Sequence, residues 1–326
     1  MVNNTMARLY GSAPDPAQLT FYWGTNGSGG PASRVLSPTP DTWYWPVDGV
    51  ALHDTLYMFN LVMRSDSAAG FAVTSIDLLR SSLHSAEPFS DYTRLATPLY
   101  APASGSHGDA YHDIAVTPNT AESGAPHPDG YLYIYGVRND SLNKKLLVAR
   151  VRPENIENFA DYRYWDGHSW QPDITRARAV TDRVFGELSV TPLADGRYLL
   201  VFQPDSLSNQ VAVSYGASPV GPWGPPIPIW TCPEDTMTRS AFTYGAKAHP
   251  HLSAPGELLI SYHVNTDNAK ELWNNADIYR PRFIKVPLNL VPQVSRLATA
   301  ADCASQETCA TKAVTRLGKA DEWGAA

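Results

Sequence analysis

The 326-residue sequence predicts an all-β protein built from repeats of one strand pair. Aromatic residues make up 11% of it, and 27 prolines and 22 glycines separate short β-rich runs, which leaves little material for long helices. The clearest repeat is Phe185–Gln203, where two short strands flank Asp195-Gly196. This dipeptide indicates a hairpin, because glycine accepts the positive φ that such a turn requires. A carboxylate, Glu187, stands just ahead of the first strand.

Three further copies of this layout occur along the chain. Two of them begin with a carboxylate, Asp48 and Asp113, and the fourth carries Lys247 and two histidines in the same region. The three acids are 65 and 74 residues apart, a spacing that suits four strands plus loops, or one propeller blade per repeat. Because first strands surround a common axis in such a fold, we expect the acids to converge there. The alternative interpretation is that each acid merely occupies a turn.

Composition excludes several classes of partner. The net charge is −7 and no basic block is present, so we expect neither nucleic acid nor an anionic membrane as a partner. No apolar run approaches the length of a membrane span, and the first eight residues lack the charged start and apolar core of a signal peptide. We expect a monomer with a single propeller domain over residues 1–290, followed by an Ala/Thr-rich tail, 291–326, that is helical or disordered.

The three cysteines do not form a disulfide framework, because their number is odd and low. Cys303 and Cys309 could close a small loop in the tail, or they could remain free thiols. The Cys-x-x-Cys spacing of a structural zinc site is absent. We therefore predict no metal site and no cofactor, and an axial calcium or other ion stays an open alternative.

Three segments in the fourth repeat carry recognisable motifs: Tyr244-Gly-Ala-Lys-Ala-His-Pro250, Ser261-Tyr-His-Val-Asn265 and Asp277-Ile-Tyr-Arg-Pro-Arg-Phe283. They resemble the secreted propeller families labelled domains of unknown function 4185 and 5005. The former includes endo-D-arabinanases of glycoside hydrolase family 183. The resemblance covers residues 1–288, and it implies an extracellular, five-bladed β-propeller that acts on furanoside polymers.

One departure from these families concerns the N-terminal end. Their members usually open with a further strand pair that bears an Asp-Gly and a Gly-Asp-Thr motif, and neither motif is found in the corresponding place here. We therefore expect the first blade to be incomplete, with the strand at Arg282–Val286 closing the ring against residues 4–23. If the missing hairpin supplies a catalytic acid, the chain is a truncated or inactive relative.

Hydrolysis of a glycoside requires two carboxyl groups across the scissile bond, one to protonate the leaving oxygen and one to activate water or attack the anomeric carbon. From the repeat positions we assign Glu187 as the general acid, because Phe185 and Leu188 surround it with apolar groups. Asp48 or Asp113 is then the base, and the other one holds the geometry or tunes the acid.

Seven further residues are candidates for binding substrate. Histidine and lysine can donate to sugar hydroxyls, and aromatic rings can stack on sugar faces, although each of these residues also has an ordinary structural interpretation. The candidates are His112, Lys247, His249, His251, Tyr244, Trp45 and Trp43. The sequence thus favours a glycoside hydrolase that acts on an arabinan-like polysaccharide, and the alternative is a carbohydrate-binding propeller without catalysis.

Overall fold

The computed structural model describes residues 2–68, 70–140, 143–205, 207–288 and 315–316. Nearly all regular structure in this part of the chain is β-strand, and its α-helix is the short α1 (Ala269–Asn274). No helix among the described residues combines the length and the hydropathy that a membrane crossing requires. The expected tail, with Cys303 and Cys309, lies outside the described residues apart from 315–316.

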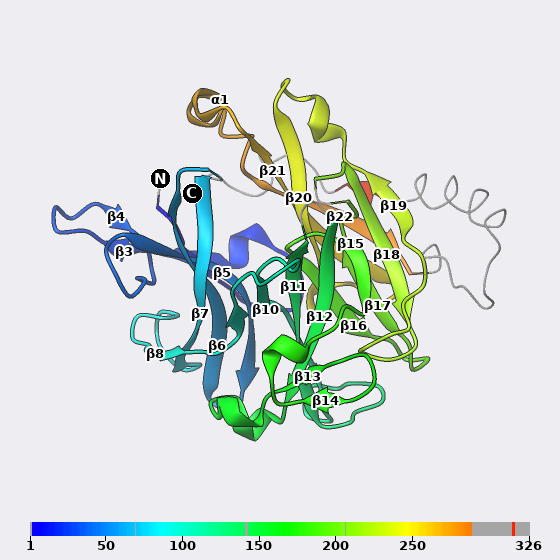
Figure 1. Ribbon diagram of the computed structural model, residues 1–326. Coiled ribbons are helices and arrows are strands. Elements are labelled where there is room, and N and C mark those ends of the chain that lie inside the picture. The colour runs from blue at the N-terminus through cyan, green and yellow to red at the C-terminus, as the bar shows by residue number, and fades with distance from the viewer. Residues whose placement is uncertain (1, 69, 141–142, 206, 289–314, 317–326) are drawn as a thin grey trace.

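Most strands belong to four antiparallel sheets that follow one another along the chain (Figure 1). The first sheet contains β5 (Thr42–Leu52), β6 (Thr55–Asp66), β7 (Gly70–Ser82) and β8 (Thr93–Ala96). The second contains β9 (Tyr100–Ala101), β10 (Ala110–Asn119), β11 (Tyr131–Asp140), β12 (Asn143–Val151), β13 (Arg163–Trp165), β14 (Trp170–Gln171) and β15 (Thr181–Val184). The third contains β16 (Leu188–Pro192), β17 (Tyr198–Phe202), β18 (Gln210–Gly216) and β19 (Ile227–Thr231). The fourth contains β20 (Ala241–Ala248), β21 (Glu257–Thr266), β22 (Pro281–Pro287) and β23 (Thr315–Arg316).

The first long strand of each sheet lies on the inside of this arrangement. Strand β10 contacts both β5 and β16, and β16 in turn contacts β20. Side chains join these neighbours, since the Thr117 hydroxyl donates to the Val190 carbonyl over 2.8 Å, and the Ser189 hydroxyl accepts from the Ala248 N–H over 2.8 Å. The all-β prediction is therefore confirmed, and the arrangement is propeller-like. The fifth blade stays a prediction, because the described residues form four such sheets.

The predicted closure of the ring is wrong. Strand β22 continues the meander of its own sheet, with β21 on one edge and β23 on the other, and it does not pair with residues 4–23. Strands β1 (Met6–Leu9) and β2 (Leu19–Tyr22) pair with each other, as do β3 (Gly24–Thr25) and β4 (Pro31–Ala32).

Side chains of this N-terminal region anchor it to the first sheet instead. The Asn4 amide exchanges two hydrogen bonds with the Val35 backbone, and Val35 packs into a cluster with Tyr44 of β5 and Met58 of β6. Arg34 forms an ion pair with Glu87, beyond β7. The region therefore extends from one side of the molecule (blue in Figure 1).

Strand β17 separates two hydrophobic clusters. Leu200 and Phe202 belong to the cluster that the first three sheets share, and Leu199 and Val201 belong to the cluster between the third and fourth sheets. Successive side chains of a strand point to opposite faces, so a fully apolar strand can fill two cores at once. Adjacent sheets are thereby held face to face, which fixes the positions of their inner strands.

A substitution at Gly136 tests how closely the backbones of strands β10 and β11 pack. A Cβ at this position would collide with the Tyr111 carbonyl and lie 2.7 Å from the His112 Cα. We expect Gly136→Ala to lower the free energy of unfolding by about 2 kcal/mol or more, because the backbone cannot yield as a side chain can. Urea denaturation measures this, with Gly27→Ala as the control, since a Cβ there meets nothing within 4 Å. Equal midpoints for the two variants would contradict the packing described.

Candidate active site

Three of the four inner strands change register at their inward-facing sections. A bulge of this kind bends the strand and redirects a side chain, and such bulges are frequent beside active sites. The shifts lie between Pro46 and Asp48 in β5, between His112 and Ala115 in β10, and between Tyr244 and Lys247 in β20. Asp48 and Asp113 therefore lie within strands, not ahead of them as the repeat pattern predicts, and Glu187 alone directly precedes its strand.

Lys247 joins three sheets at this level. Its Nζ donates to the carbonyl of Val47 over 3.0 Å and to the carbonyl of Ile114 over 3.4 Å. It also lies 3.6 Å from Oδ2 of Asp48, and its side chain is only 16% exposed. The ammonium that the sequence suggested for sugar binding is thus surrounded by oxygens of the protein itself.

Asp48 faces hydrogen-bond donors on both of its oxygens. Oδ1 accepts from the N–H of Gly49 over 2.9 Å, and Oδ2 accepts from the N–H of Val116 over 2.8 Å. The second bond ties β5 to β10, next to the contact with Lys247. The side chain remains 29% exposed, so this carboxylate is both held in place and reachable from solvent.

Asp113 differs from Asp48 in both exposure and hydrogen bonding. It is fully buried, and neither carboxyl oxygen has a hydrogen-bond partner among the described residues. Burial raises the pKa of Asp113 to about 8, with Lys247 opposing the shift and Asp48 adding to it. The carboxyl is therefore largely protonated at neutral pH, since a buried site disfavours the charged form.

His112 does not contact solvent in this structure. Its ring packs edge-on against Tyr164 of β13, with 5.1 Å between the ring centroids. Burial lowers the pKa of His112 to about 3, so the imidazole is neutral under ordinary conditions. A fully buried ring cannot touch a substrate without movement of its surroundings.

Glu187 lies against β20, at the bulge that also positions Lys247. A Cβ on Gly245 would stand 2.7 Å from its Oε2, so the carboxylate and the strand lie in close contact here. Gly245 also has a positive φ of 70°, which other residues rarely adopt. Burial raises the pKa of Tyr244, and the nearby charge of Glu187 adds to this. The segment Gly245–Lys247 thus contacts Glu187 and Asp48 and acts on the pKa of Asp113.

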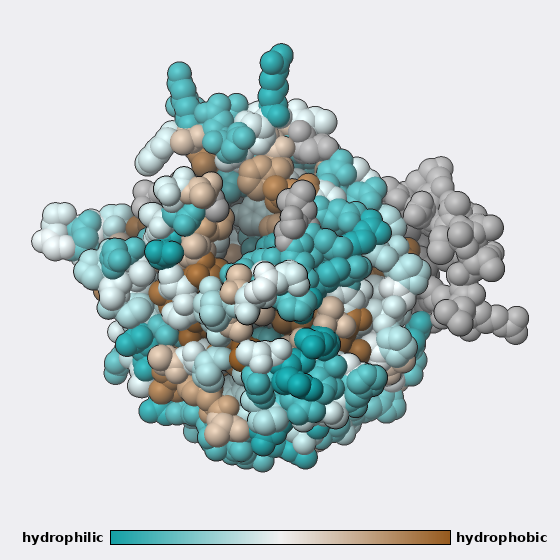
Figure 2. All heavy atoms as spheres, in the orientation of Figure 1, coloured by the Kyte–Doolittle hydropathy of each residue, from teal (hydrophilic) through white to brown (hydrophobic). Residues whose placement is uncertain are grey.

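Aromatic side chains lie on the strands and segments that carry these acids. Trp45 of β5 packs edge-on against Phe71 of β7, with 4.6 Å between the ring centroids. The ring centroid of Tyr244 lies 6.1 Å from that of Phe185 and 5.3 Å from that of His263. Figure 2 shows the surface hollowed between the regions that β7 and the β20–β21 pair occupy in Figure 1, with hydrophobic residues around the opening. Trp43, the other predicted stacking residue, is partly exposed on the same strand as Trp45.

The two predicted histidines of the fourth repeat lie beyond Lys247, on the side away from Gly245. Nε2 of His249 lies 2.7 Å from the Ser261 hydroxyl, and burial lowers the pKa of His249 to about 4. His251 is exposed in the 3-10 turn Pro250–Leu252. The charges of Lys247, His251 and His263 add to the lowering of the His249 pKa, so His249 lies within electrostatic reach of Lys247, and a role for either histidine in binding sugar stays a prediction.

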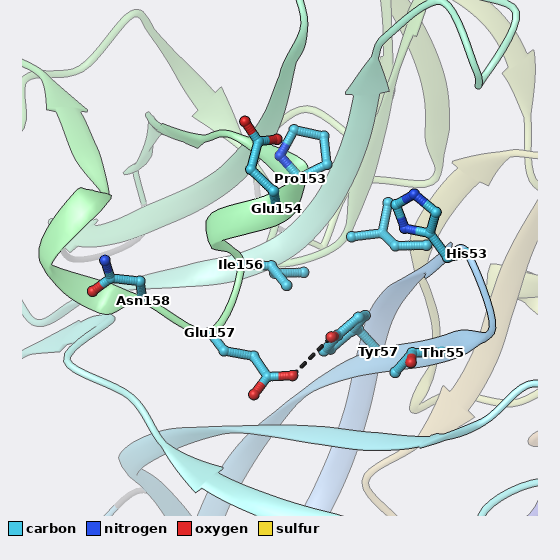
Figure 3. Close-up of a pocket in the computed structure, with 9 residues that line it drawn as sticks. His53, Thr55, Tyr57, Pro153, Glu154, Ile156, Glu157 and Asn158 are labelled. Atoms are coloured by element: carbon cyan, nitrogen blue, oxygen red, sulfur yellow. Dashed lines mark hydrogen bonds between the residues drawn. The ribbon is translucent and has the colours of Figure 1, made fainter.

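A separate cavity of about 550 Å³ lies at the other end of the inner strands (Figure 3). It is formed by the β5–β6 turn and by the segment that follows β12. Its carboxylate Glu157 accepts a hydrogen bond from the Tyr57 hydroxyl over 2.8 Å and forms an ion pair with Arg80 at 2.7 Å. Glu154 and His53 also line this cavity, which is distinct from the segment Gly245–Lys247.

The described residues contain no group of three or more His, Cys, Asp or Glu side chains that could hold a metal ion. The sequence analysis missed two polar residues beside Glu187, Tyr111 and Lys144. A Cβ on Gly186 would lie 3.2 Å from Nζ of Lys144 and 3.9 Å from the Tyr111 hydroxyl. The glycine that precedes Glu187 was the one local signal, because a residue without a side chain lets other groups lie close to the backbone.

The fold and these contacts define an all-β, propeller-like protein with an acidic site at its inner strands. Residues 32–289 match the family described as Domain of unknown function (DUF5005), and the chain belongs to this family. That part of the predicted resemblance is confirmed. The relation to domain of unknown function 4185 and to glycoside hydrolase family 183 stays a prediction.

Individual relatives are more distant. Notoamide biosynthesis cluster protein J of Aspergillus sp. (strain MF297-2) is 27% identical over 149 residues, and the match spans 43% of this chain and 38% of that protein. A Bacteroides ovatus protein provisionally described as a hydrolase has a TM-score of 0.62 and 19% identity, over 82% of this chain and 72% of its own. An α-L-arabinofuranosidase from Clostridium thermocellum has a TM-score of 0.40 and 10% identity, over 75% of this chain and 89% of its own.

Lys247→Met tests whether the lysine holds the sheets together. The change leaves two carbonyls without their donor, and we expect the free energy of unfolding to fall by about 1–3 kcal/mol. The control is Lys285→Met on β22, because Lys285 is 3.9 Å from Glu257 and both side chains are 37% exposed, so this pair contributes little. Urea denaturation of both variants measures the difference, and equal losses would rule out the special role of Lys247.

Asp113→Asn tests the buried neutral carboxyl. Between the unfolded pKa of 3.8 and the folded value of about 8, the unfolded chain releases a proton that the folded protein retains. Asp113 therefore makes stability fall as pH rises through this range, by up to about 1.4 kcal/mol per pH unit. Asparagine cannot ionise, so the stability of Asp113→Asn relative to the wild type should increase from pH 5 to pH 7. Urea denaturation at both pH values is the measurement, and a constant difference would show that Asp113 is already ionised.

Proposed function

We propose that this protein is a glycoside hydrolase that acts on a furanoside, arabinan-like polysaccharide. One observation carries the proposal: Glu187 lies against Gly245, and Lys247, two residues later, lies 3.6 Å from Asp48 and acts on the pKa of Asp113, with the rings of Tyr244 and Phe185 beside Glu187. Such an arrangement provides two acids across a bound sugar and rings on which sugar faces can stack.

The different environments of the acids support a division of roles. Asp113 is unsuited to be the base, because it is largely protonated at neutral pH and has no exposed surface. Asp48 is partly exposed and faces N–H donors and an ammonium, so it suits the base. Asp113 is then the neutral carboxyl that tunes the site, and Glu187 is the general acid.

In the proposed reaction, Glu187 gives its proton to the glycosidic oxygen as the bond between that oxygen and the anomeric carbon breaks. A water molecule adds to the anomeric carbon and loses a proton to Asp48, so the sum is hydrolysis. Lys247 keeps the Asp48 carboxylate in place while it accepts this proton.

The fold shared with the Bacteroides ovatus protein described as a hydrolase supports a hydrolytic role. The furanoside substrate and an extracellular location are proposed from the sequence motifs that resemble secreted propeller families. A second candidate function is carbohydrate binding without cleavage. It is favoured by the fact that both oxygens of Asp48 already accept hydrogen bonds from the backbone.

Glu187→Gln tests the general acid. The glutamine keeps the shape of the side chain but cannot supply a proton, so we expect release of reducing ends from arabinan to fall about 10²–10⁴-fold with unchanged thermal stability. Glu157→Gln, in the separate cavity, is the matched control and should keep its turnover.

Turnover retained in Glu187→Gln would refute the acid role. A wild-type protein that is retained on an arabinan affinity gel, but releases no reducing ends, would favour the second candidate function.

A further inference from the structure

Lys144 is a half-buried lysine beside the candidate acid. It lies near the start of β12, where this strand pairs with β15. Its side chain forms no hydrogen bond or ion pair with any residue that the structure describes, and its Nζ lies over the Phe185 ring. The three N–H groups of this ammonium can therefore be satisfied by solvent or by a ligand.

The side chain reaches across to the segment that leads into the third sheet. Its Nζ lies 5.0 Å from the centroid of the Phe185 ring, and a Cβ on Gly186 would stand 3.2 Å from it. The ammonium therefore lies close to Gly186, the residue that precedes Glu187. The Tyr111 hydroxyl approaches Gly186 as well.

The nearby acids do not satisfy this lysine. Asp109 instead accepts a hydrogen bond from the Asn139 amide over 2.8 Å, and Glu187 lies against Gly245. Burial lowers the pKa of Lys144, while the charges of Asp109 and Glu187 act in the opposite direction. The ammonium is thus held near two carboxylates without forming an ion pair with either, and its donors remain available to a ligand.

The surroundings also indicate the chemistry of that ligand. When Glu187 carries the proton of the general acid, the Lys144 ammonium and the Asp109 carboxylate balance, so no net positive charge is left to favour an anionic sugar such as a uronate. A neutral hydroxyl oxygen is an acceptor that needs no such charge, and the adjacent Phe185 ring suits the apolar face of a sugar. We propose that Lys144 donates a hydrogen bond to a hydroxyl of the sugar unit beside Glu187, and so determines which neutral sugar is accepted. This proposal rests on the proposed function.

Lys144→Met tests the proposal, and the chain supplies a matched control in the next residue. Lys145 forms an ion pair with Asp182 at 3.0 Å, at a half-exposed carboxylate. For Lys144→Met we expect KM for neutral arabino-oligosaccharides to rise about tenfold or more, since a charge-assisted hydrogen bond is lost. Its Tm should not fall, because no described residue loses a hydrogen bond or an ion pair when methionine replaces this lysine. Lys145→Met should keep the wild-type KM and gain no Tm.

The two readouts separate substrate binding from a structural role. A lower Tm in Lys144→Met would mean that the lysine stabilises the fold, and this would overturn the proposal. A wild-type enzyme that cleaves arabinan, while Lys144→Met keeps its KM, would overturn the proposal and leave the proposed function standing. A wild-type protein that neither cleaves nor binds arabinan would overturn both.

Discussion

The contacts of Lys247 are the constraint on which the rest of the site depends. One ammonium binds oxygens from β5 and β10 while its own strand, β20, belongs to the fourth sheet. It compensates part of the charge of Asp48 and limits the shift of the Asp113 pKa, which burial and Asp48 both raise. A single lysine therefore links three sheets and stabilises the charged form of two carboxyl groups.

Backbone irregularities place the acids within reach of this lysine. A regular strand would direct every second side chain toward the axis, whereas a bulge lets neighbouring positions be redirected. The bulge in β20 provides two contacts of different kinds, since Gly245 lies against Glu187 and Lys247 reaches Asp48 two residues later. The geometry of the site therefore comes from the same feature that interrupts the sheet.

The sequence predicted what local patterns control. The hairpin at Asp195-Gly196 and the strand-rich composition depend on turn chemistry and local pattern, and they led to the correct class of fold, while the shared site of the three acids stays a prediction. The closure by residues 282–286 failed, because no local pattern states which distant strand a given edge pairs with. Asn4 has its partner 31 residues away, at Val35, and this contact, not strand pairing with β22, anchors the N-terminal region.

The residues that were missed or misplaced share one physical cause. Whether a lysine binds ligand or holds the protein together depends on which oxygens surround it in three dimensions, and sequence position does not reveal this. Lys247 belongs to a recognisable motif and is enclosed by protein carbonyls, whereas Lys144 lies in an ordinary hairpin, and its side chain has no hydrogen-bond partner among the described residues. The two lysines therefore differ in what surrounds them, and their sequence neighbours do not reveal that difference.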